Sequence, residues 1–153
     1  MRLRPAVGTH RVYAVLLGGL AFAFFLRVLG QALVAADQAS FLSPMAEWYS
    51  GLVPYPALLL IQIVILAMQA TVSRAIWKGS GTFAAPRPAV GHRLQWFSYA
   101  YCGVMVLRYI VTMTVYPERR WLSGTIPIFF HWVLAAYLFT LGRYYARMRH
   151  DRA

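Results

Sequence analysis

The chain has 153 residues, enough for one domain, and it is 60% hydrophobic but only 12% charged, whereas a soluble domain is about 25% charged. That shortage of charge excludes an ordinary soluble domain, and apolar runs of about 20 residues predict helices that cross a bilayer. The formal net charge of +11 would suggest nucleic-acid binding in a soluble protein. Here the basic residues gather at the ends of the apolar runs, as membrane orientation requires, so we expect no nucleic-acid partner.

Four apolar spans are predicted, over residues 12–36, 57–77, 94–116 and 122–145. The first begins like a secretory signal, but it is longer than the 7–15 residues of a signal core and contains Arg27, so we expect it to be retained. After it, Ser43-Pro44 favours a helix start and Gly51 a stop, which predicts a short external helix at the membrane surface. The expected fold is therefore all-α: an integral membrane four-helix bundle in a single domain, 1–153, with that interfacial helix between spans 1 and 2.

Glycine, proline and basic residues over 78–93 predict a basic surface loop after the second span. A tight external connection is predicted after the third span, at Pro117-Glu118-Arg119-Arg120. The side that carries both termini and the basic loop has 11 Lys and Arg residues, against 2 on the opposite side. By the positive-inside rule, both termini are expected in the cytoplasm, in a bacterial inner (plasma) membrane.

Each span also carries polar side chains that are unusual inside a bilayer. They are Arg27 and Gln31 in the first span, Gln62 in the second, Arg108 in the third and His131 in the fourth. At ~1.5 Å per helical residue, Arg27 and Arg108 lie ~12 Å below the outer ends of their spans, Gln62 ~9 Å and His131 ~9–15 Å. Because charge in lipid is costly and marks function, this shared depth predicts a ligand-binding layer in the outer half of the bundle.

The residue types in this layer indicate the chemistry of a ligand. No Asp or Glu lies in any span, and a guanidinium fork suits a carboxylate or phosphate, while glutamine and histidine add hydrogen bonds. The layer would suit the head group of an anionic lipid, a polyprenyl phosphate or a quinone.

Other chemistries have less support in the sequence. His131 is the only embedded histidine, which argues against a bis-histidine haem, and the single cysteine, Cys102, excludes a multi-cysteine metal site. No catalytic or metal motif is present, so no catalytic residue, cofactor or metal is assigned and enzymatic activity stays open.

Structural roles are open for the same residues. Arg27 can extend along its stem toward the interface, and Glu47 on the external helix can act as a latch that pairs with Arg27 or Arg108. Gln62 and Gln69 can join helices, as amides do in membranes. The alternative function is therefore a non-catalytic accessory or scaffold subunit of a membrane complex, and a redox or transfer reaction is a third.

Two groups of residues are expected to shape the bundle itself. Small residues allow helices to approach closely, and those expected to do so are Gly18, Gly19, Gly30, Gly103 and Gly142. Aromatic residues near span ends are expected to anchor the protein at the membrane interface, and these include Tyr13, Trp96, Tyr99, Tyr144 and Tyr145.

Overall fold

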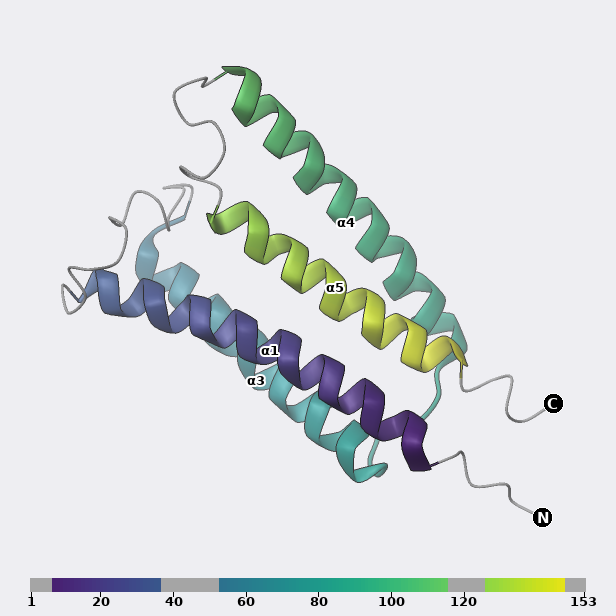
Figure 1. Cartoon of the computed structure of the whole chain (residues 1–153). Helices are drawn as coiled ribbons and strands as arrows, with labels where there is room; N and C mark the ends of the chain where they lie inside the picture. The colour runs from purple at the N-terminus through teal and green to yellow at the C-terminus, as the bar shows by residue number, and fades with distance from the viewer. Residues whose placement is uncertain (1–6, 37–52, 116–125, 148–153) are drawn as a thin grey trace, which may run out of the picture.

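The computed structural model describes residues 7–36, 53–115 and 126–147 (Figure 1). These ranges form four helices: α1 (Val7–Ala35), α3 (Tyr55–Lys78), α4 (Pro88–Val115) and α5 (Ile126–Arg147). The prediction of an all-α chain is confirmed over these ranges. Helices α1, α3 and α4 are long and apolar enough to cross a membrane. The interfacial helix predicted between spans 1 and 2 lies outside the described residues.

Helix α5 is the inner helix of the bundle. It packs against α1 on one side and against α4 on the other, and α1 packs in turn against α3 (Figure 1). Among its described side chains, only Phe129 and Arg147 are exposed. Most of the surface of α5 is therefore covered by neighbouring helices.

The hydrophobic core lies toward the end of the bundle that holds the α3–α4 loop. Its residues come from α1, α3 and α5: Tyr13, Ala14, Leu17, Val72, Ile76, Tyr137, Leu141, Tyr144 and Tyr145. The expectation that Tyr13, Tyr144 and Tyr145 anchor the protein at the membrane interface is wrong, because all three are buried between helices.

Tyr144 and Tyr145, near the end of α5, can be buried because their hydroxyls find partners inside the protein. Tyr144 donates a hydrogen bond to the carbonyl oxygen of Ala84 at 2.9 Å, and Tyr145 donates to that of Phe83 at 3.0 Å. A buried tyrosine usually satisfies its hydroxyl in this way. These bonds fasten the loop after α3, which begins at Gly79 with the left-handed φ of 63° that ends the helix.

Helices α4 and α5 cross at two glycines. A Cβ atom built on Gly91 would lie 2.8 Å from the carbonyl oxygen of Gly142, and one built on Gly142 would lie 2.9 Å from that of Gly91. Close packing is therefore confirmed for Gly142. The expectation of close packing is wrong for Gly18, Gly19 and Gly103, because a Cβ built on each would meet nothing within 4 Å. Gly91 was not expected at a crossing, because α4 begins at Pro88, before the expected third span over 94–116.

Candidate functional site

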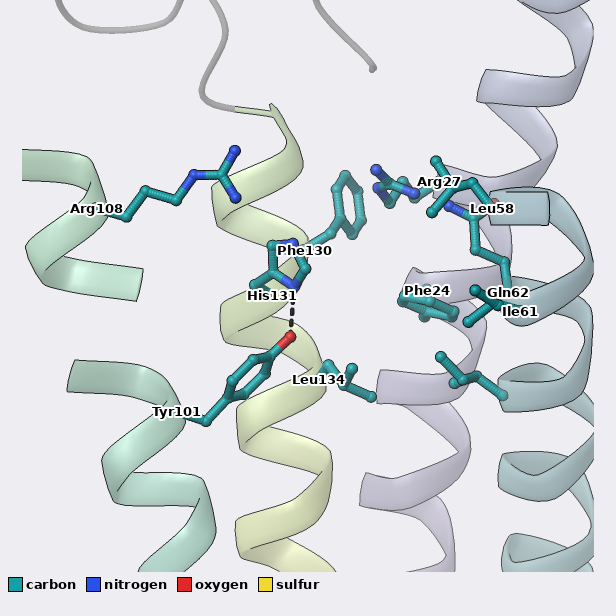
Figure 2. A pocket seen from close by; sticks show the side chains of 11 residues that line it. Phe24, Arg27, Leu58, Ile61, Gln62, Tyr101, Arg108, Phe130, His131 and Leu134 are labelled. Atoms are coloured by element: carbon teal, nitrogen blue, oxygen red, sulfur yellow. Dashed lines mark hydrogen bonds between the residues drawn. The ribbon is translucent and has the colours of Figure 1, made fainter. Parts of the chain in front are cut away.

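A cavity of about 190 Å³ is lined by residues of all four described helices (Figure 2). Its lining consists of Phe24, Arg27, Leu58, Ile61, Gln62, Ile65, Tyr101, Arg108, Phe130, His131 and Leu134. Four of the five residues predicted from sequence to bind a ligand are among them, and each comes from a different helix. The four residues predicted to lie at one depth, Arg27, Gln62, Arg108 and His131, thus line one cavity.

The wall formed by α1 and α3 is a buried hydrogen-bonded group. Arg27 donates from Nη1 to Oε1 of Gln31 at 3.0 Å, and Gln62 donates from Nε2 to the same oxygen at 3.0 Å. The three side chains are 7%, 0% and 4% exposed. Gln31 does not line the cavity but lies behind it, where it joins Arg27 to Gln62.

Arginine determines which way both amides of this group point. A guanidinium can only donate hydrogen bonds, so the Gln31 atom that faces Arg27 must be its oxygen. The Gln62 atom that faces the same oxygen must then be its amide nitrogen. In the described part of the chain, Oε1 of Gln62 and Nε2 of Gln31 are left buried without hydrogen-bond partners. The Gln31–Gln62 bond joins α1 to α3, as the helix-joining interpretation of the glutamines expects.

Arg27 also contacts α5. Its guanidinium carbon lies 5.7 Å from the centroid of the Phe130 ring, which is within the range of a cation–π interaction. Arg27 therefore meets its own helix at Gln31 and α5 at Phe130, and it is joined to α3 through the Gln31–Gln62 bond. This arrangement positions the guanidinium at the cavity.

The opposite wall is formed by α4 and α5. The Tyr101 hydroxyl and Nδ1 of His131 share a hydrogen bond of 2.5 Å, and the two rings meet edge-on with their centroids 5.7 Å apart. The Tyr101 ring also stacks on Phe97, with centroids 5.9 Å apart and an interplanar angle of 10°. Contacts on both sides hold Tyr101 in place, so the Tyr101–His131 pair presents its polar atoms in a defined position.

Arg108 approaches the cavity from α4, opposite Arg27 (Figure 2). It follows Tyr101 by seven residues, which places the two side chains on the same helix face. Arg108 is partly exposed, and over residues 7–36, 53–115 and 126–147 its guanidinium makes no hydrogen bond or ion pair. It is therefore the cationic group of the cavity best placed to receive a ligand.

Beside these polar groups, much of the cavity wall is apolar. The apolar lining residues are Phe24, Leu58, Ile61, Ile65, Phe130 and Leu134. Helices α3 and α4 form two sides of the cavity but, within the described ranges, do not pack extensively against each other. The cavity thus lies between a wall from α1 and α3 and a wall from α4 and α5 (Figure 2).

Sequence reasoning left some site residues unassigned. Tyr101 was not assigned to the site, although its spacing of seven residues from Arg108 could have indicated it, and Phe24 and Phe130 carry no polar signal. Gln69, which shares a face with Gln62, is 1% exposed and lies outside the cavity lining. The proposed latch residue Glu47 lies outside the described residues.

Comparison of the chain with known protein families, with curated proteins and with solved structures gives no match. No group of three or more His, Cys, Asp or Glu side chains is placed to hold a metal ion within the described ranges. The functional argument therefore depends on the chemistry of the cavity. That chemistry combines fixed hydrogen-bond donors, two guanidinium groups and an apolar wall.

Proposed function

We propose that this protein is a small polytopic membrane protein that binds the head group of an anionic or quinone-like lipid in the four-helix cavity. The observation that carries this proposal is the meeting of Arg27, Gln62, Arg108 and His131, from four helices, around one cavity. Buried polar and charged groups in a membrane protein are costly and mark binding or transport sites. Arg27 and Arg108 would bind the charge or carbonyl oxygen of the head group, while Gln62 and His131 orient it and Gln31 supports Arg27.

The proposed orientation puts this cavity in the outer half of an inner bacterial membrane. Both termini and the α3–α4 loop would be cytoplasmic, because 11 of the Lys and Arg residues lie on that side and 2 on the other. Arg27 lies near the end of α1, and His131 near the start of α5. The cavity would therefore be reached from the outer leaflet.

Native mass spectrometry of gently extracted protein tests the proposal. We expect a reproducible bound lipid or quinone in the wild type, lost in Arg27→Ala and in Arg108→Ala. Arg74→Ala is the matched control, because Arg74 is exposed on α3 and does not line the cavity, so the ligand should be retained. A stoichiometric partner protein with no bound small molecule would contradict the proposal and favour an accessory or scaffold subunit.

A further inference from the structure

We infer that the head group is anionic, a phosphate or carboxylate held by Arg108, and that the hydrocarbon chain of the lipid leaves the cavity between α3 and α4. This inference rests on the proposed function and narrows it to one class of ligand. Arg108, the Tyr101–His131 pair, the size of the cavity and the lack of extensive packing between α3 and α4 support it.

The positive charge of Arg108 favours an anionic ligand over a neutral one. A quinone can accept hydrogen bonds from a guanidinium, but it leaves the positive charge uncompensated in surroundings of low polarity. A phosphate or carboxylate compensates the charge and accepts two parallel hydrogen bonds from the same guanidinium. Within the described residues no other group compensates the charge of Arg108. Arg27 brings a second positive charge to the same cavity. An anion is therefore the ligand that this arrangement favours.

The Tyr101–His131 pair adds a donor for a second oxygen. A neutral histidine and a tyrosine together carry one N–H and one O–H group, and their mutual hydrogen bond uses one of these hydrogens. Whichever tautomer the histidine adopts, one N–H or O–H donor stays available. Since both residues line the cavity with Arg108, an anion at Arg108 can accept a further hydrogen bond from the pair.

The dimensions of the cavity point to a lipid rather than a free ion. Its volume of about 190 Å³ is below the ~300–1,000 Å³ of pockets that enclose a whole drug-sized ligand, so a head group fits but its chain does not. The residues Ile61, Ile65 and Leu134 add apolar side chains to the cavity wall. Within the described ranges α3 and α4 do not pack extensively against each other, and both helices have exposed apolar residues. A hydrocarbon chain can therefore pass from the cavity directly into the bilayer.

Titrations followed by native mass spectrometry of the full-length protein in neutral detergent test the inference. The probes are phosphatidylglycerol, phosphatidylcholine, decylubiquinone and inorganic phosphate. We expect phosphatidylglycerol to bind at least tenfold more tightly than phosphatidylcholine, and inorganic phosphate to bind too weakly to detect. Arg108→Gln should abolish this tenfold preference, and Arg108→Lys, which keeps the charge, should retain part of it. Arg74→Gln removes an equal charge outside the cavity and should leave the preference unchanged.

Each alternative outcome has a separate meaning. Tight binding of decylubiquinone that depends on Arg108, without a preference for phosphatidylglycerol, would overturn the anionic head group but leave the proposed function standing. Equal binding of inorganic phosphate and phosphatidylglycerol would overturn the lipid chain between α3 and α4. A preference for phosphatidylglycerol that survives Arg108→Gln would overturn the assignment to Arg108. If no probe binds through the cavity residues, the proposed function itself fails. Melting temperatures of the variants identify any that fail to fold. If Arg108→Gln does not fold, the comparison of the wild type with Arg108→Lys tests the inference instead.

Discussion

Substitution of Gly91 by alanine tests the crossing of α4 and α5. The added Cβ would lie 2.7 Å from the backbone nitrogen of Ala146 and 2.8 Å from the carbonyl oxygen of Gly142. Backbone atoms cannot rotate away, so the two helices must separate. Inserting a methyl group into a packed interior costs about 1–3 kcal/mol, whereas alanine in a helix is favoured over glycine by about 0.5–1 kcal/mol. We expect a net loss of up to about 2.5 kcal/mol in the free energy of unfolding.

Gly103→Ala is the matched control in the same helix, because a Cβ at Gly103 would meet nothing within 4 Å. Its propensity gain is the same, so the difference between the two variants isolates the clash at about 1–3 kcal/mol. Reversible unfolding in mixed micelles with increasing dodecyl sulfate would measure both. Gly142→Ala should destabilise in the same way, and the double variant should lose less than the sum, because separated helices relieve both contacts. Equal stabilities of Gly91→Ala and Gly103→Ala would refute the close crossing.

Three further predictions concern the interior and the orientation. Gln62→Leu should lower the free energy of unfolding by about 1 kcal/mol, because it removes the hydrogen bond to Gln31. Gln69→Leu should leave the free energy of unfolding unchanged or raise it, because the side-chain amide of Gln69 makes no hydrogen bond within the described residues. Reversible unfolding in mixed micelles compares the two variants. Tyr144→Phe should speed proteolysis of the α3–α4 loop, because it removes the hydrogen bond to the Ala84 carbonyl. The control is Tyr99→Phe, at an exposed tyrosine of α4, which should leave the rate of proteolysis unchanged. Reporter fusions after Lys78 and at the C-terminus should report the cytoplasm, and an external signal from either would contradict the orientation.

Hydrophobic run length was enough to predict the helices, and residue position was enough to predict a common depth. Arg27, Gln62, Arg108 and His131 could be placed at one level because helical rise is constant. Which helix neighbours which could not be predicted, because lipid and protein interior are equally apolar and a hydrophobic face does not identify its partner. The position of α5 between α1 and α4 and the crossing of α4 and α5 at Gly91 and Gly142 were therefore found only in the structure.

Tyrosines illustrate the same limit at the level of single residues. A tyrosine near a span end suits the membrane interface, but a partner inside the protein makes burial equally favourable, as at Tyr144 and Tyr145. Tyr101 shows the converse: its spacing from Arg108 indicated a shared face, while its bond to His131 depends on the packing of α4 on α5. Polar partners on different helices are set by helix rotation, which one sequence does not define.

Photo-crosslinking from inside the cavity tests most directly whether it holds a lipid. Photoleucine placed at Leu134, which lines the cavity, preserves the shape of the side chain, and the same residue at Leu107, 61% exposed on α4, samples the bulk bilayer. After irradiation in cells, we predict that mass spectrometry will find one predominant lipid attached at Leu134, enriched in anionic head groups and lost in Arg108→Gln, and a mixture resembling the whole membrane at Leu107. The same mixture at both positions, or a protein crosslinked at Leu134, would contradict the account.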